Sequence, residues 1–232
     1  MSVTAVVVAC GYEFKPLKKQ MSGISTREVG GKVYYCGKLE EKDVVLVQSG
    51  VGRTNAAATT AVLCVLFKAQ LVINSGAAGG ISRTLKIGDI IVAEKLVYGD
   101  VDNCCFGLQF GQVPYDSPAF YTAEEILHKF QTVCQQMVAE QPVGIHRGLV
   151  VTVESFCESE ETKQGLLKHW PEAMAVEMEG CAVAHVCQQF KVPCLIVRSV
   201  SDTADDHAEY DSFASLAGER SAQMTRAFLK QI

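Results

Sequence analysis

The sequence predicts an α/β protein, a three-layer α/β/α sandwich with a central mixed sheet. Continuous β-branched runs at 3–9 and 194–202 are typical of strands that are covered on both faces. Amphipathic stretches at 53–67 and 120–140 alternate with such runs, and this alternation places helices against both faces of a sheet. Because no linker or internal repeat interrupts the pattern, we expect one domain over residues 1–232.

Composition limits the classes of function. The net charge of −5 and the pI near 5.6 argue against binding to nucleic acid or to an anionic membrane. The ten cysteines form no C-x-x-C pair, so we expect no metal site and no cofactor, but reduced thiols in a cytoplasmic protein. The apolar run at 3–10 is too short to span a membrane and has no basic leader.

The first strand ends just before Glu13. A carboxylate at this place lies where open α/β sheets bind ligands, yet a helix dipole explains an acid in a first turn equally well. Strands are then expected at 31–39 and 43–48. The Gly50-Val51-Gly52 turn before the helix at 53–67 is a weak phosphate signal, and a tight turn explains it as well.

The middle of the chain combines two strands with two possible binding segments. Residues 70–75 read as a buried strand, followed by a small-residue loop at 76–80 whose amides could hold an anion or a hydroxyl. A turn and strand follow at 85–93. The long irregular stretch at 97–116 is expected to form a binding wall, and 120–140 a helix.

Two acids mark the last third. Glu177 and Glu179 should share a face if the strand that begins near 175 continues that far, and Gly180 then opens a helix. A buried pair of carboxylates needs partners or a function, and a purely structural role has equal weight. The remaining expected elements are strands at 148–153 and 194–202 and helices at 161–169 and 212–232.

Polar residues therefore collect where independent strands end, and four motifs among them resemble the purine nucleoside phosphorylase superfamily. These motifs lie at 74–80, 86–90, 176–179 and 198–202, and the resemblance runs from Val3 to about Leu229. It implies the sandwich fold and cleavage of the N-glycosidic bond of adenine nucleosides by water. The implied substrates are 5′-methylthioadenosine, S-adenosylhomocysteine and related nucleosides.

The resemblance also implies catalytic roles. Adenine leaves poorly as an anion, so Asp202 would protonate N7, and its pKa must then be raised by burial or by a neighbouring charge. Glu13 would hold and activate the attacking water. Glu179 would bind the ribose 2′- and 3′-hydroxyls near the oxocarbenium-like centre. Arg198 would position the water or the neighbouring carboxylates.

The implied binding residues form a base wall, a ribose wall and an apolar 5′ wall. Phe156 would stack on adenine beside backbone groups of Cys157, while Glu177 and Met178 would flank the ribose and base. The other implied contacts are Ala77, Ser201, Val51, Phe106, Leu108, Pro114 and Tyr210. Ala77, Asn103 and Cys157 depart from the family pattern, which affects substrate preference more than reaction class. Members of the family are homodimers, so a homodimer is expected.

Alternatives remain open from sequence. A phosphate-dependent phosphorylase or an AMP-nucleosidase-like enzyme would need cations for phosphate, and only Arg53 and Arg83 could reach in. A non-catalytic nucleoside-binding protein on the same fold would have lost Glu13, Glu179 or Asp202, and all three are present. His185 reads as a packed core histidine, Trp170 as a surface or interface anchor, and 205–207 as a hydrophilic loop rather than a metal site.

Overall fold

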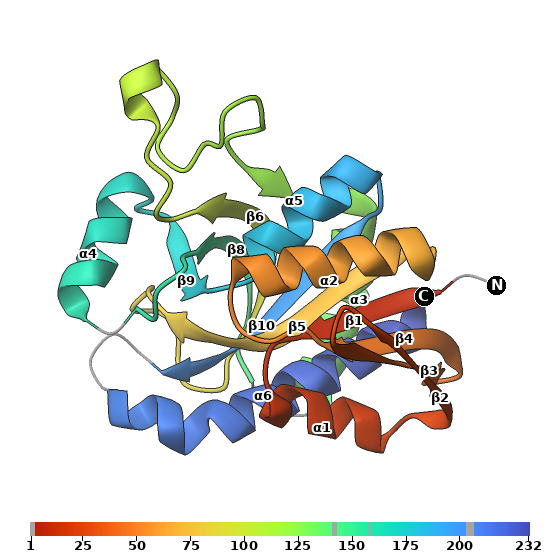
Figure 1. Cartoon of the computed structure of the whole chain (residues 1–232). Helices are drawn as coiled ribbons and strands as arrows, with labels where there is room; N and C mark the ends of the chain where they lie inside the picture. The colour runs from red at the N-terminus through yellow and green to blue at the C-terminus, as the bar shows by residue number, and fades with distance from the viewer. Residues whose placement is uncertain (1–2, 141–142, 158, 203–206) are drawn as a thin grey trace.

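The computed structural model describes residues 3–140, 143–157, 159–202 and 207–232, and side chains of all of these except 136–140 and 207–211. Its strands form one mixed sheet in the order β10-β6-β8-β9-β5-β1-β4-β3-β2, with β7 paired to β6 (Figure 1). The strands are β1 Thr4–Val8, β2 Ser22–Val29, β3 Lys32–Leu39, β4 Lys42–Gln48, β5 Leu71–Gly80, β6 Ile90–Tyr98, β7 Phe120–Tyr121, β8 Ile145–Thr152, β9 Ala173–Glu177 and β10 Cys194–Asp202.

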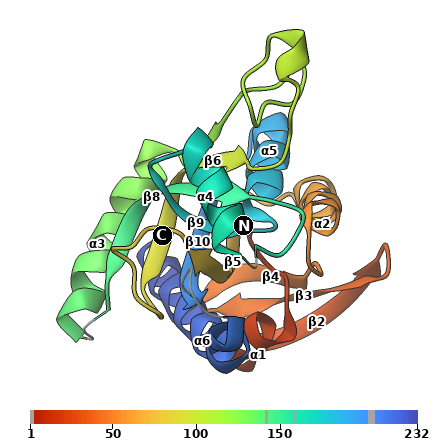
Figure 2. The same ribbon diagram turned by 90° about the vertical axis from the view of Figure 1, so that its left-hand side faces the viewer.

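Helices cover both faces of this sheet (Figures 1 and 2). They are α1 Gly11–Lys19, α2 Arg53–Leu66, α3 Glu124–Glu140, α4 Glu160–His169, α5 Gly180–Phe190 and α6 His207–Gln231. Apolar side chains of α2 and α5 fill one core against the sheet, and those of α1, α3 and α6 fill the other. The predicted three-layer α/β/α sandwich with a mixed sheet is confirmed. No helix in the described ranges is long and apolar enough to cross a membrane.

Part of the sheet closes on itself. β5 pairs with β10 along most of its length and with β9 at Gly79 and Gly80, and β10, β6, β8 and β9 complete the ring. The loop predicted at 76–80 is therefore wrong, because these small residues continue β5. The backbone groups of these residues form hydrogen bonds with β10, and glycine's low β-propensity gives no sign of this pairing in the sequence.

Other differences have local causes. β2 was not predicted, because seven of its eight residues are exposed and carry no apolar alternation. The helix expected from residue 120 begins at Glu124, since Phe120 and Tyr121 pair with β6 as β7. Trp170 is only 7% exposed and packs beside Phe110, so its predicted place on the surface is wrong.

Candidate active site

An open cavity with about 560 Å³ of space lies where several strands end. Its lining consists of acids, small residues and apolar side chains. They come from α1, β5, β9 and β10 and from the loops that follow β4 and β8. The predicted residues that line it are Glu13, Val51, Ala77, Phe156, Cys157, Glu177, Met178, Glu179, Ser201 and Asp202. Segments far apart in the sequence thus converge on one site.

Glu13 lies in the first turn of α1 and is 4% exposed. It is therefore both a first-turn acid of a helix and a residue of the cavity lining. Its Oε2 accepts hydrogen bonds from the amides of Ala9 and Cys10 at 2.8 and 2.9 Å, and its Oε1 accepts one from Ala77 at 2.9 Å. Burial raises the pKa of Glu13 above its usual value, although these three amides oppose the shift. The carboxyl is thereby held in one orientation beside the cavity.

Gly76 explains why small residues follow the buried part of β5. A Cβ at this position would lie 2.5 Å from Oε1 of Glu13, which is closer than any real contact. A Cβ at Gly79 would lie 3.0 Å from Oδ1 of Asp202. The glycines therefore let two carboxylates approach the strand closely, and this is the physical reason for them rather than an anion-binding nest.

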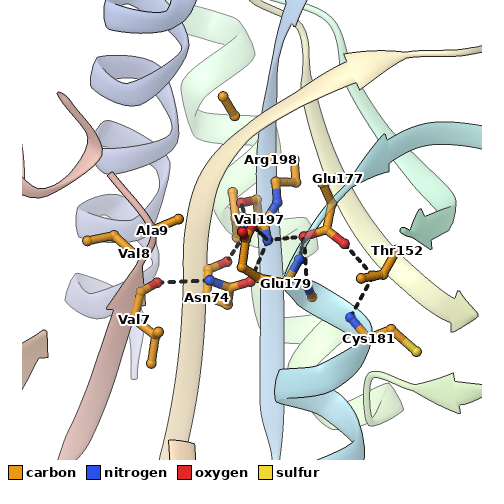
Figure 3. Close-up of polar contacts among 12 residues, drawn as sticks. Val7, Val8, Ala9, Asn74, Thr152, Glu177, Glu179, Cys181, Val197 and Arg198 are labelled. Atoms are coloured by element: carbon orange, nitrogen blue, oxygen red, sulfur yellow. Dashed lines mark hydrogen bonds and ion pairs between the residues drawn. The ribbon is translucent and has the colours of Figure 1, made fainter. Parts of the chain in front are cut away.

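Arg198 is 1% exposed and lies on β10; it does not line the cavity itself but contacts Glu177, which does (Figure 3). Its guanidinium donates to the side-chain oxygen of Asn74 at 2.5 Å, to the Asn74 carbonyl at 3.2 Å, and to Oε2 of Glu177. Thr152 donates to the other oxygen of Glu177. Oε2 of Glu177 also accepts hydrogen bonds from the Glu179 and Gly180 amides at 2.9 and 2.6 Å. Glu177 is therefore saturated by protein partners.

Glu179 occupies the N-cap position of α5, because β9 ends at Glu177. The prediction that Glu177 and Glu179 share one face of a strand is therefore wrong, although both residues line the same cavity. Oε1 of Glu179 accepts a hydrogen bond from the Gly52 amide at 2.8 Å, and Oε2 lies 3.9 Å from Arg198. Burial first, and then the neighbouring charge of Glu177, raise the pKa of Glu179 to about 7.

Asp202 ends β10 and is 6% exposed. The Ser201 hydroxyl donates a hydrogen bond to Oδ2 of Asp202 at 2.8 Å and lies 3.3 Å from the Ala78 carbonyl oxygen. Ser201 thereby orients the carboxyl of Asp202, which lines the same cavity as Glu13 and Glu179.

The apolar part of the lining comes from short loops. Phe156 follows β8 and is 43% exposed, whereas Cys157 beside it is buried. Met178 and Val51 complete this part of the wall. Such a cavity, with a partly uncovered aromatic ring on one side and carboxylates on the other, suits a flat base joined to a polar sugar.

Three predicted wall residues do not line the cavity of their own chain. Phe106, Leu108 and Pro114 lie in the segment between β6 and β7, which projects from the body of the molecule in both views (Figures 1 and 2). Phe106 is 77% exposed there. The side chain of Tyr210 lies outside the described residues, as do Asp205 and Asp206.

Some participants were missed by sequence reasoning. Ala9 and Tyr12 also line the cavity, and Gly79 does so within the segment predicted to approach a ligand. Asn74 and Thr152 hold Arg198 and Glu177 from below, and a polar residue inside an apolar strand was the available signal for both.

The charges of the site are mostly negative. In the described part of the chain, the cavity lining contains no lysine or arginine. Arg53 pairs with Asp100 and Glu154, and Arg83 is exposed. His185 packs against Phe120 and bonds to Tyr98, as expected for a core histidine. Among the described residues, no group of three His, Cys, Asp or Glu side chains is placed to hold a metal ion.

A sandwich fold with this carboxylate-lined cavity places the chain among nucleoside-cleaving proteins, and comparison with known families agrees. Residues 3–230 match the Phosphorylase superfamily, and the chain belongs to this family. It is 38% identical over 230 residues to a 5′-methylthioadenosine/S-adenosylhomocysteine nucleosidase of Listeria monocytogenes, a match that covers 98% of both chains.

Solved structures extend the comparison. The nucleosidase of the same name from Neisseria meningitidis, in complex with methylthio-immucillin-A, superposes with a TM-score of 0.96 at 32% identity and full coverage of both chains. The futalosine hydrolase of Helicobacter pylori superposes with a TM-score of 0.92 at 29% identity, covering 100% of this chain and 98% of that one.

Proposed function

We propose that this protein hydrolyses the N-glycosidic bond of 5′-methylthioadenosine and S-adenosylhomocysteine and releases adenine. The observation that carries the proposal is the convergence of Glu13, Glu179 and Asp202 on one cavity of a chain that is 38% identical over its length to a nucleosidase of that name. Related 5′-substituted adenosines belong to the same substrate class.

Each acid has a chemical task in this reaction. Asp202, oriented by Ser201, donates a proton to N7 so that adenine leaves as a neutral base. Glu13, whose raised pKa makes it a stronger base, holds and activates water. Glu179 accepts hydrogen bonds from the ribose hydroxyls, and the negative lining stabilises the oxocarbenium-like transition state.

Arg198 and the neighbouring residues organise these acids. The guanidinium of Arg198, fixed by Asn74, bonds to Glu177 and lies near Glu179. It thereby compensates part of the carboxylate charge and sets the orientation of the water-binding side. The carboxylate of Glu177 supports the ribose wall by accepting hydrogen bonds from Arg198, Thr152 and the amides that precede α5, while Phe156, Cys157, Met178 and Ala77 hold the base and sugar.

Water rather than phosphate is the proposed nucleophile. A dianionic phosphate needs cationic partners, whereas the cavity presents carboxylates and the nearby Arg53 is already paired. The test is release of the free base from methylthioadenosine, adenosylhomocysteine, adenosine, inosine and futalosine, with and without phosphate. In the absence of phosphate, we expect the free sugar with its 5′ substituent as the second product. Strict phosphate dependence with ribose 1-phosphate as product would contradict the proposal, and exclusive turnover of futalosine would redirect it.

We also propose a homodimer in which the loop between β6 and β7 serves the partner's cavity. Phe106 and Tyr121 are 77% and 67% exposed, and large apolar side chains at such exposure mark an interaction surface. A second copy would bring Phe106, Leu108 and Pro114 to the 5′ end of the site, and Tyr210 would complete that wall. Sedimentation of wild type and Phe106→Asp checks the homodimer, because a monomeric wild type would exclude it.

All ten cysteines are free, which suits a cytoplasmic location.

A further inference from the structure

Arg53 joins three separate segments at the rim of the cavity. Its Nη1 and Nη2 donate to the two oxygens of Asp100 at 2.6 and 3.1 Å, and its Nε donates to Oε2 of Glu154 at 2.6 Å. Oδ2 of Asp100 also accepts a hydrogen bond from the Glu154 amide at 2.8 Å. Arg53 begins α2, Asp100 follows β6 and Glu154 follows β8, so one guanidinium ties together three loops.

The first of these loops touches a site acid directly. The Gly52 amide, one residue before Arg53, donates to Oε1 of Glu179 at 2.8 Å. Gly52 has a φ of 94°, and a Cβ there would lie 2.8 Å from Oε1 of Glu154. Glu154 therefore packs directly behind the turn that presents this amide, and Arg53 fixes Glu154 in that place.

The second loop carries the base wall. The Val153 amide donates to the Glu177 carbonyl oxygen at 2.9 Å, and the Glu154 amide to Asp100 at 2.8 Å. Phe156 and Cys157 follow at once and line the cavity. The bond to Asp100 thus anchors the chain two residues before the partly uncovered ring of Phe156.

The ion pairs are too exposed to act mainly on stability. The side chains of Arg53, Asp100 and Glu154 are 24%, 33% and 48% exposed, and exposed pairs contribute little to the free energy of unfolding. A bidentate fork shared by two carboxylates does impose geometry. The effect of this cluster is therefore expected on the placing of the loops.

We propose that Arg53, Asp100 and Glu154 are positioning residues, forming a clamp that holds the Gly52 amide against Glu179 and the 154–157 loop against the bound base. The clamp rests on the proposed nucleosidase activity, because it acts through Glu179 and Phe156. Through these two groups it sets the affinity for the ribose and the base rather than the chemistry of bond cleavage, which belongs to Asp202 and Glu13.

The test compares Arg53→Met, Arg53→Lys and Asp100→Asn with Arg83→Met, the last removing an exposed arginine away from the cavity. For methylthioadenosine we expect KM to rise on the order of tenfold in Arg53→Met and Asp100→Asn, with kcat changed much less. Arg53→Lys should recover part of the loss, because it restores the charge without the fork. The double variant Arg53→Met/Asp100→Asn should be no worse than either single one, because both break the same unit.

Two further readouts separate positioning from a structural role. Urea unfolding midpoints of the variants should match wild type. The wild-type KM should also rise as salt is increased from about 0.05 to about 0.5 M, where half-exposed charges are screened, whereas that of Arg53→Met should depend on salt less. Unchanged KM in both single variants, or a loss of activity that follows a loss of stability, would overturn the clamp.

Failure of the proposed function is distinguishable from failure of the clamp. If wild type turns over none of the nucleosides, the proposed function fails, and calorimetric binding of adenine takes the place of KM. Weaker adenine binding by Arg53→Met and Asp100→Asn than by wild type and Arg83→Met would then support the clamp. Equal binding by all four proteins would overturn it.

Discussion

Replacing Glu179 by glutamine should change how the stability of the protein depends on pH. Burial and the charge of Glu177 raise the pKa of Glu179 from 4.5 to about 7 in the folded state. Between these two pH values the folded state binds more protons than the unfolded state. The free energy of unfolding of wild type therefore falls as pH rises, and the loss is complete above the folded pKa. Glutamine does not titrate, so Glu179→Gln lacks this loss.

The magnitude follows from the two pKa values. Each unit of difference corresponds to about 1.4 kcal/mol, so the full effect above pH 7 is about 3 kcal/mol. Between pH 5 and pH 8 the stability difference should change by about 2 to 3 kcal/mol in favour of Glu179→Gln. Using this change between two pH values removes any constant effect of the amide on packing.

The assay is urea unfolding of both proteins at pH 5, 6, 7 and 8, at one protein concentration and one ionic strength. Groups away from the site are common to the two proteins, so their titrations cancel in the difference. Glu161→Gln, which alters an exposed acid of α4, is the matched control, and its difference from wild type should stay constant. Parallel curves for Glu179→Gln and wild type, or a gap that narrows as pH rises, would refute the argument from burial and like charge.

Three further substitutions test the other parts of the site. Asp202→Asn should lower kcat by at least about 100-fold, because an amide cannot deliver the proton to N7, and near-normal kcat would remove Asp202 from this role. Glu13→Gln should lose hydrolysis to a similar degree, about 100-fold, while calorimetry still detects nucleoside binding; retained turnover would count against it. Gly76→Ala should displace the Glu13 carboxyl, because its Cβ would lie 2.5 Å from Oε1, and should lower kcat more than the conservative change Ala77→Gly; equal kcat values in the two variants would contradict this.

The sequence predicts most of the fold because the core strands are strongly apolar. The strand at 194–202 has the same bounds in the structure, and all of its residues are buried. Failures lie where tertiary contacts override local preference. Gly76 to Gly80 continue a strand because β10 and β9 pair with them, and β2 forms because β3 offers an edge, although its own residues are exposed.

The candidate site is less accessible to sequence reasoning, because its order comes from contacts between distant segments. Strand ends indicated Glu13, Glu179 and Asp202, but not that Glu177 is held by Thr152 and Arg198. Telling the two acids apart needs distances, since both are buried at the same cavity and differ only in their hydrogen-bond partners. The proposed 5′ wall is a second case, because Phe106 does not line the cavity of its own chain and no pattern within one chain shows where a second copy would place it.

The imbalance of charge links the site to the choice of nucleophile in the proposed reaction. The carboxyl groups of Glu13, Glu177, Glu179 and Asp202 line the cavity, and that of Asp202 holds a proton in the proposed reaction. Arg198, bonded to Glu177, is the neighbouring cation. Two like charges about 4 Å apart repel by about 4 kcal/mol at an effective dielectric constant near 20, so a phosphate dianion is disfavoured there and neutral water is not. The developing ribosyl cation gains from the same field. In the proposed reaction one arrangement of acids therefore both disfavours phosphate relative to water and stabilises the transition state, and adding a cation to the cavity would weaken both effects together.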